Sequence, residues 1–436
     1  MSEIKRTATK KTIFVSLFIL NILIILGFWY TNNHLLLSGD SLYNALGRIF
    51  GLLGTYLFLI QILLISKIRF IENTYGHDKL TRFHHYNGIV AFALLFLHGL
   101  YLTIGYKLVA NISFLSQFIK FVGGDEIGTA VIAFVILIIV ILLSITLSKI
   151  KIKYELWYLT HLFTYLVIIL AFAHQIENGM DLYSNNSFLI YWYILYILII
   201  GLLIIYRFLI PIYNYFTNKF VVSKVVKENK DITSIYISGK EINNFKFKAG
   251  QFGIFRFLNK DFYQAHPFSF SKVYNGNEIR ISIKNLGDFT NKVKEIKVGT
   301  PVFIEGPFGV FTKNKIDNRN IVLIAGGIGI TPIRSIIEEL SSDTSKEITV
   351  VYSVREENEI VFKNELASLN KKNKIYYNIS SKDGHLTEDK LRNIILNTSK
   401  TDVFICGPTP MTESLIEILQ KMGVPKKRIH YERFSF

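Results

Sequence analysis

Cysteine is almost absent from this chain of 436 residues, and acidic residues are scarce. The single cysteine, Cys406, excludes an internal disulfide. The 33 acidic residues stand against 49 lysines and arginines, so the net charge is +16. An excess of cations can indicate nucleic-acid binding, but that function needs a basic stripe on a soluble surface. Many of these cations instead stand at the ends of apolar runs, so we expect membrane lipid and no nucleic acid as a partner.

Charged residues make up only 19% of the chain, whereas apolar and aromatic residues make up 50%. This apolar excess lies in the first half of the sequence. Six segments there are long enough to cross a hydrocarbon core of ~30 Å. They are Ile13–Tyr30, Asn44–Ser66, Tyr86–Tyr106, Ile127–Ser148, Leu156–Ile176 and Leu189–Ile210. We expect an all-α, six-helix membrane bundle in residues 1–216. Since no small-residue cleavage site follows Tyr30, the first segment is expected to be a retained helix.

The charges that flank these segments predict an orientation. Lysines and arginines follow the second, fourth and sixth segments, whereas the intervening connections carry few or balance them with acidic residues. Cytoplasmic loops of membrane proteins carry the excess of Lys and Arg. We therefore expect a multi-pass protein of the cell membrane, with both termini and the soluble half in the cytoplasm.

Four histidines lie within the apolar segments, where an imidazole is costly unless it has a function or a partner. His84 and His98 are fourteen residues apart in the third segment, and His161 and His174 are thirteen apart in the fifth. Fourteen residues make just under four helical turns, so the first two share a face ~21 Å apart. Two facing pairs at matched depths predict two b-type haems, each held from both sides. The simpler alternative is four buried histidines bonded to backbone or neighbouring hydroxyls.

Two details of this pattern stay open. His85 has the same thirteen-residue spacing to His98, so it competes with His84 as the inner ligand. Thirteen residues also leave an ideal helix ~140° short of a full turn. The fifth segment is therefore distorted, or the two rings approach from different sides. His34 and His77 lie in loops and are expected to be solvated.

Arg48 lies inside the second segment near its outer end. A membrane arginine needs an anionic partner or water. Propionates of an outer haem would be such a partner, and the alternative is an arginine that reaches the lipid headgroups.

The residue pattern of the soluble half changes near residue 317. Residues 217–316 contain short β-branched runs broken by Gly and Asn, which predict a small β-barrel. Residues 317–436 alternate strands with helical stretches, which is typical of an α/β domain with a parallel sheet. Internal repeats and low-complexity tracts are absent.

Several motifs in this half favour a flavin and a dinucleotide. His266-Pro267-Phe268-Ser269 places an aromatic ring beside a hydroxyl, which suits a flavin ring, although an ordinary core aromatic explains it as well. The turn from Gly287 to Thr290 offers backbone and a hydroxyl to a pyrophosphate.

A glycine-rich turn follows the strand Ile321–Ala325 and precedes a helix, the arrangement that binds dinucleotide phosphates. Its glycines, Gly326, Gly327 and Gly329, lack the GxGxxG spacing of the plain Rossmann fingerprint. A second strand, Val403–Cys406, ends in Cys406-Gly407-Pro408, at the sheet edge where ligands bind. A small buried cysteine is the alternative there.

Taken in order, these motifs resemble the ferredoxin–NADP reductase superfamily. Joined to the paired histidines, to Gly47-Arg48 and to Asp78-Lys79, they resemble the ferric reductase and NADPH oxidase family in its compact bacterial form. Family members show His-Arg at the first ligand, where this chain has His84-His85. The resemblance implies an FAD domain in residues 217–316 and an NAD(P) domain in residues 317–436.

The resemblance also implies roles for single residues. Phe268 and Ser269 would contact the isoalloxazine, and His266, Pro267, Gly287 and Thr290 would line the FAD side. The dinucleotide would be bound by Gly326, Gly327, Gly329 and Thr331, with Gly407 and Pro408 nearby. Cys406 would sit beside the nicotinamide, and Glu432 and Phe434 would form the terminal acidic-x-aromatic ending that covers the flavin. Phe436 competes for that last role. Arg355 would meet a ribose or its 2′-phosphate, which leaves NADH and NADPH both open.

We therefore expect a transmembrane oxidoreductase that moves electrons from NAD(P)H through FAD and two haems to an outside acceptor. Oxygen, giving superoxide, is the preferred acceptor. A ferric or cupric complex and a partner protein are the alternatives, and the sequence gives no sign of a regulatory subunit.

Overall fold

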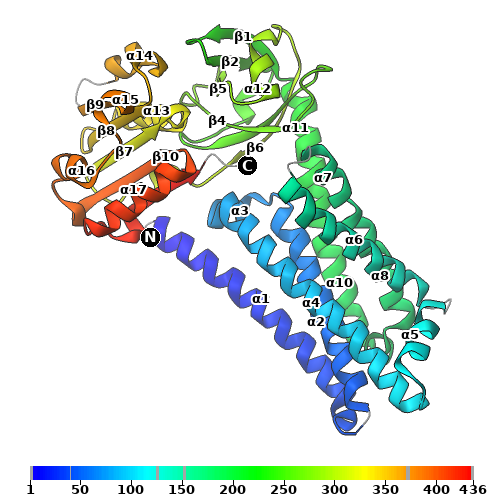
Figure 1. Ribbon diagram of the computed structural model, residues 1–436. Helices are drawn as coiled ribbons and strands as arrows, with labels where there is room; N and C mark the ends of the chain where they lie inside the picture. The colour runs from blue at the N-terminus through cyan, green and yellow to red at the C-terminus, as the bar shows by residue number, and fades with distance from the viewer. Residues whose placement is uncertain (1–2, 40, 124–126, 151–153, 370–373, 434–436) are drawn as a thin grey trace. The chain divides into compact units, whose positions relative to one another are not determined.

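The computed structural model describes residues 3–39, 41–123, 127–150, 154–369 and 374–433. It divides the chain into two compact units (Figure 1). One comprises residues 12–66 and 81–203. The other comprises residues 1–11, 67–80 and 204–436. The second unit therefore includes the connection between the second and third membrane segments as well as the soluble half.

The described residues contain six helices long and apolar enough to span a membrane. They are Ala8–Asn33, Ser41–Ile65, Lys79–Ala110, Gly128–Thr146, Leu156–Asn178 and Asn186–Asn218. Each overlaps one expected segment; four of them contain the expected range in full, whereas the second ends one residue earlier than expected and the fourth is shorter at both ends. The corresponding helices are α1 (Glu3–Asn33), α2 (Ser41–Ile65), α4 (His77–Ala110), α6 (Gly128–Ile150), α7 (Tyr154–His161) with α8 (Phe163–Asn178), and α10 (Asn186–Leu203). Short helices α5 (Phe114–Gly123) and α9 (Met180–Tyr183) lie in the connections.

The fifth span is interrupted one residue after His161. Helix α7 ends at His161 and α8 begins at Phe163, with Leu162 between them. A break at this point changes the rotational phase between His161 and His174. The distortion that the thirteen-residue spacing left open is therefore present.

Glycines bring α2 and α4 close together. A Cβ added at Gly47 would lie 2.8 Å from Leu102, and one at Gly54 would lie 2.9 Å from Leu95. Small residues allow such close approach between membrane helices, where lipid gives no hydrophobic driving force for association. The positions of the histidines on α4 are therefore set by backbone-to-backbone packing.

The FAD-side strands form two three-stranded antiparallel sheets. Their orders are β1-β2-β5 and β4-β3-β6. The strands are β1 (Val221–Lys227), β2 (Ile232–Ser238), β3 (Phe252–Phe257), β4 (His266–Ser269), β5 (Ile279–Lys284) and β6 (Val302–Phe308). Isolated bridges, Val221 with Pro301 and Phe270 with Ile281, link the two sheets. The expected strands are present, but a closed barrel is not confirmed.

The NAD-side strands form one parallel sheet of order β11-β10-β7-β8-β9. These are β7 (Asn320–Gly326), β8 (Glu347–Val354), β9 (Lys374–Ile379), β10 (Thr401–Gly407) and β11 (Ile429–Arg433). Helices α13 (Ile330–Leu340) and α14 (Lys363–Ser368) cover one face, and α16 (Glu388–Ile394) and α17 (Thr409–Lys421) cover the other. The strand order reverses between β7 and β10, which is where doubly wound sheets bind their ligands.

Candidate functional site

The four membrane histidines form two groups. The ring centroids of His84 and His161 are 6.1 Å apart, with their planes inclined by 60°. Metal–imidazole bonds are about 2 Å long, so the separation of the centroids leaves room for one ion between the two rings. His98 and His174 lie close enough to interact electrostatically. His85 packs against Tyr86 instead, so the geometry favours His84 as the inner residue.

The two histidines of α4 are oriented by backbone carbonyls of α2. His84 Nδ1 lies 3.2 Å from the carbonyl oxygen of Gln61, and His98 Nδ1 lies 2.8 Å from that of Gly47. A histidine that donates from Nδ1 keeps Nε2 unprotonated and available as a metal ligand. Both rings therefore have the tautomer and the anchoring that a ligand needs.

The two histidines of the fifth span are held more loosely. His161 Nδ1 lies 3.4 Å from Ser144 Oγ, and its ring stacks on Trp157 at 5.2 Å. His174 Nδ1 is buried without a hydrogen-bond partner in the described part of the chain. A buried polar atom without a partner is costly. All four residues fit a pair of haems, which would leave no ligand nitrogen exposed to hydrocarbon.

Arg48 has an anionic protein partner that the sequence did not reveal. Its Nη1 lies 3.8 Å from Asp181 Oδ1 and 3.3 Å from Met180 Sδ. Asp181 is buried, which raises the pKa of its carboxyl, while a 2.6 Å hydrogen bond from Asn33 stabilises the charged form. Asp181 is therefore an anionic partner for Arg48 within the protein.

The flavin motif forms the whole of strand β4, which pairs with β3. Ser269 pairs with Phe252 across β4 and β3, and Ser269 is buried. The rings of His266 and Phe289 are 4.0 Å apart, and Phe268 lies 6.4 Å from Phe289. His266, Phe268 and Ser269 are thus together, with Pro267 between them in the strand.

The turn before α12 (Asp288–Lys292) uses its hydroxyl within itself. Thr290 Oγ1 accepts hydrogen bonds from the backbone N–H groups of Leu286 and Gly287, at 2.8 and 2.9 Å. Thr290 therefore shapes the turn, and contact with a pyrophosphate needs the remaining capacity of its hydroxyl.

The glycine-rich turn after β7 and the segment Cys406-Gly407-Pro408 form the predicted nicotinamide site. They lie where β7 and β10 end side by side. Ala325 and Cys406 are register partners, and Cys406 is fully buried. Gly329 lies in the turn after β7, and a Cβ there would sit 2.0 Å from the carbonyl oxygen of Cys406. The turn can approach β10 only because this residue is glycine.

The remaining predicted residues of this side divide into two groups. Gly326 ends β7, Gly327 follows it, and Thr331 Oγ1 bonds to the carbonyl of Ile328 at 3.0 Å near the start of α13. Gly407 ends β10, and Pro408 follows directly. Arg355 is exposed just beyond β8. Glu432 pairs with Cys406 across β10 and β11, whereas Phe434 and Phe436 lie outside the described residues.

Three family models match successive parts of the chain. "Ferric reductase like transmembrane component" matches residues 50–172, "FAD-binding domain" matches residues 217–312, and "Oxidoreductase NAD-binding domain" matches residues 323–416. The first range contains His84, His98 and His161 and ends two residues before His174, and the other two contain both soluble motifs. The chain joins a ferric reductase-like transmembrane domain to an FAD- and NAD-binding oxidoreductase module.

Relatives of known name match the oxidoreductase module. Flavohemoprotein A of Dictyostelium discoideum is 31% identical over 50% of this chain and 60% of its own length. The flavohemoprotein of Candida norvegensis is 31% identical over 49% of this chain and 56% of its own length. The chain thus spans somewhat more than half of these relatives. The FAD/NAD-binding domain of a Vibrio cholerae nitric oxide dioxygenase is 28% identical, with a TM-score of 0.44 over 50% of this chain and 98% of that structure.

Gln175 was not predicted as a site residue from the sequence, and His77 was predicted to be solvated. Gln175, next to His174, accepts from Trp192 Nε1 at 2.8 Å and Tyr196 Oη at 3.0 Å, and donates to Thr55. His77, expected to be solvated, instead pairs with the buried Glu72 at 3.1 Å. The only available signal for the first was a glutamine beside a histidine inside an apolar span.

Gly51 gives a direct test of the outer histidine. A Cβ there would lie 2.5 Å from His98 Nδ1, so Gly51→Ala should displace the ring and break its bond to Gly47. We expect haem content to fall from two to one per chain, measured as pyridine haemochrome. Gly99→Ala is the matched control, because its Cβ meets open space. Two haems with an unchanged spectrum in Gly51→Ala would contradict the assignment.

Proposed function

We propose that the chain is a transmembrane NAD(P)H oxidase that reduces oxygen to superoxide on the outer side of the cell membrane. The observation that supports it most is the pairing of His84 with His161 and of His98 with His174, in a chain whose soluble half matches FAD- and NAD-binding family models. FAD and two b-type haems, held by these residues and by the flavin motif, would supply the conversion of a two-electron hydride into single electrons. Both termini are placed in the cytoplasm by the positive-inside rule.

The overall reaction balances without another reactant. NAD(P)H and two O₂ give NAD(P)⁺, one proton and two superoxide anions. Cys406 and Glu432, adjacent across β10 and β11, lie at the sheet edge where the nicotinamide would bind. Phe268 and Ser269 would hold the flavin ring, and the turn at Gly326, Gly327, Gly329 and Thr331 would hold the dinucleotide phosphates.

Arg48 supports oxygen as the acceptor. Arg48 directly follows Gly47, and the carbonyl oxygen of Gly47 accepts a hydrogen bond from His98. The guanidinium therefore belongs to the residue next to the one that anchors the outer histidine. A fixed positive charge stabilises an anionic product such as superoxide as it forms. Asp181, 3.8 Å away, orients the guanidinium.

The deciding experiment measures superoxide from the purified full chain supplied with FAD and NAD(P)H. We expect two haems per chain and cytochrome c reduction that superoxide dismutase abolishes. Activity that requires a ferric or cupric chelate would instead identify a metalloreductase. Activity that requires a co-purifying protein would identify an electron-donor subunit. Absence of haem from protein purified out of haem-supplied cells would contradict all three proposals.

A further inference from the structure

A buried cluster of charges surrounds Glu305 on strand β6. Lys67 Nζ lies 2.6 Å from Glu305 Oε2, and Arg207 Nη1 lies 3.3 Å from the same oxygen. All three side chains are mostly buried, with exposures of 12% for Lys67, 10% for Glu305 and 22% for Arg207. Glu305 is therefore the common partner of both cations.

The two cations come from the connection between the second and third spans and from the C-terminal part of the sixth span. Lys67 lies two residues after Ile65, which ends α2, and Arg207 lies in the π-helical segment Ile204–Leu209, which follows α10. A π-turn inside a helix is uncommon and occurs mostly at functional positions. Lys67 has a left-handed backbone, with φ of 56°, which a non-glycine residue seldom adopts. Both cations thus sit on unusual backbone.

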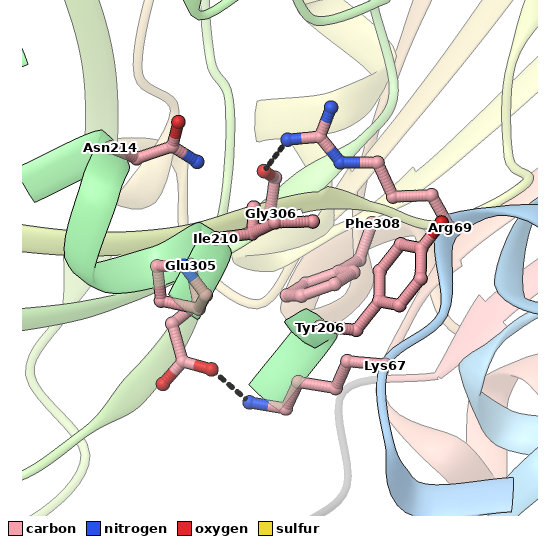
Figure 2. Close-up of a pocket in the computed structure, with 9 residues that line it drawn as sticks. Lys67, Arg69, Tyr206, Ile210, Asn214, Glu305, Gly306 and Phe308 are labelled. Carbon is pink, nitrogen blue, oxygen red and sulfur yellow. Dashed lines mark hydrogen bonds and ion pairs between the residues drawn. The ribbon is translucent and has the colours of Figure 1, made fainter. Parts of the chain in front are cut away.

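Further contacts fix the same stretch of β6. Arg69 Nη2 donates to the carbonyl oxygen of Gly306 at 3.2 Å, and Lys67 Nζ lies 5.6 Å above the ring of Phe308. Figure 2 shows Lys67 and Arg69 reaching Glu305 and Gly306, with Tyr206 and Asn214 lining the pocket beside them. Strand β6 pairs with β3, where Phe252 partners both Phe308 and Ser269 of the flavin motif. Strand β3 therefore lies between this stretch of β6 and β4, which carries the predicted flavin contact.

Stability alone is a weak explanation of this cluster. Burial lowers the pKa of Lys67 to about 8, and this effect outweighs the attraction of Glu305. The unfolded chain keeps Lys67 protonated to about pH 10.4. The unfolded state therefore binds more protons between these values, and the free energy of unfolding rises with pH across that window. The cost of burying a charged Lys67 therefore opposes the stabilisation of Glu305, whose pKa the two cations lower despite its burial, and a buried ion pair of this kind is weak evidence for stability.

We propose that Glu305 is a positioning residue that, through Lys67 and Arg207, fixes the connection after α2 and the end of the sixth span to strand β6 of the flavin-side sheet, so that electrons pass from the flavin to the haems. This inference rests on the proposed function. Misplacing reacting groups by about 1 Å can cost roughly 100-fold in rate, so loss of the cluster should slow haem reduction without affecting flavin reduction.

The test compares two steps in the purified full chain by anaerobic stopped flow. In Glu305→Gln and in Lys67→Met, flavin bleaching by NAD(P)H and direct reduction of ferricyanide should match the wild type. Haem reduction should be about 10- to 100-fold slower. The double variant Glu305→Gln/Lys67→Met should reduce its haems no more slowly than the slower single variant, because both substitutions remove the same interaction. Glu278→Gln is the matched control, because Glu278 pairs with Lys272 at 2.9 Å on the same domain but is more exposed.

A second readout does not depend on electron flow. Hydrogen exchange of residues 67–80 should become about tenfold faster or more in Glu305→Gln, the change expected when a charged hydrogen bond is lost. If Glu305→Gln fails to fold because two cations lose their carboxylate, Lys67→Met remains informative, since Arg207 still neutralises Glu305. Its thermal stability should equal or exceed that of the wild type.

The pH profile separates positioning from simple packing. Lys67 is faced by Glu305, Arg207 and Glu72, and Glu305 is also faced by Arg256. Haem reduction should decline as pH rises through about 8, the pKa of Lys67, and Lys67→Arg should keep its rate to higher pH. Unchanged haem reduction in both Glu305→Gln and Lys67→Met, in chains with two haems, would overturn the inference. Chains without haem would overturn the proposed function instead.

Discussion

Replacement of His98 by alanine is expected to leave one haem per chain and to abolish superoxide formation. His98 is the one outer histidine whose ring is anchored, by the carbonyl of Gly47 at 2.8 Å, and His174 has no such anchor in the described residues. Without His98 a single unanchored imidazole remains to hold the outer group. Since loss of an orienting partner alone typically costs 10- to 100-fold in metal affinity, loss of the ligand itself should cost at least about 100-fold.

The measurements are haem content and two rates in the purified variant. NAD(P)H-dependent reduction of ferricyanide should stay at the wild-type rate, because the flavin and nicotinamide residues are untouched. Superoxide should fall to background. His34→Ala is the control, because His34 is exposed and its described contacts, with the Thr31 carbonyl and the Tyr30 ring, are both local. A His98→Ala chain that keeps two haems and full superoxide output would show that His98 is a structural histidine.

The second large effect is expected at the nicotinamide edge. In Gly329→Ala the new Cβ would lie 2.0 Å from the carbonyl oxygen of Cys406, a collision between backbones that no side-chain rotation relieves. The turn between β7 and α13 must move away from β10. A shift of about 1 Å at a hydride-transfer site can cost roughly 100-fold in rate.

We expect flavin reduction by NAD(P)H to slow by about that factor, while dithionite still reduces flavin and haem. FAD and haem contents should be unchanged, which separates a misplaced nicotinamide from a misfolded domain. Gly201→Ala provides the matched substitution, because its Cβ meets open space. An unaltered rate with NAD(P)H in Gly329→Ala would mean that this turn is not where the nucleotide binds.

Elements with a strong local pattern were predictable from the sequence. The six apolar spans and strands such as β2 and β5 carry their periodicity in consecutive residues, and the glycine-rich turn after β7 has its own signature. The histidine pairs were predictable because a polar ring in hydrocarbon is conspicuous. Strand β11 was missed, because its residues, Ile429–Arg433, mix apolar, charged and aromatic side chains and pair with only one neighbour, β10.

The contacts that sequence reasoning missed are long-range ion pairs. Asp181 is 133 positions from Arg48, and Glu305 is 238 positions from Lys67. A carboxylate in a loop looks the same in a sequence whether it is solvated or buried against an arginine. Only the fold shows which opposite charges meet, and the electrostatic part of the site therefore had to come from the structure.

The burial of Cys406 has a practical consequence for spectroscopy. As the only thiol, and fully buried at the end of β10, it is shielded from maleimide and methanethiosulfonate reagents. Cysteines introduced at exposed positions can therefore be labelled selectively without first removing the native one. Fluorophore or spin-label pairs placed on the FAD-side and NAD-side sheets would then report distances between them during turnover, in a protein that still carries its own nicotinamide-edge cysteine.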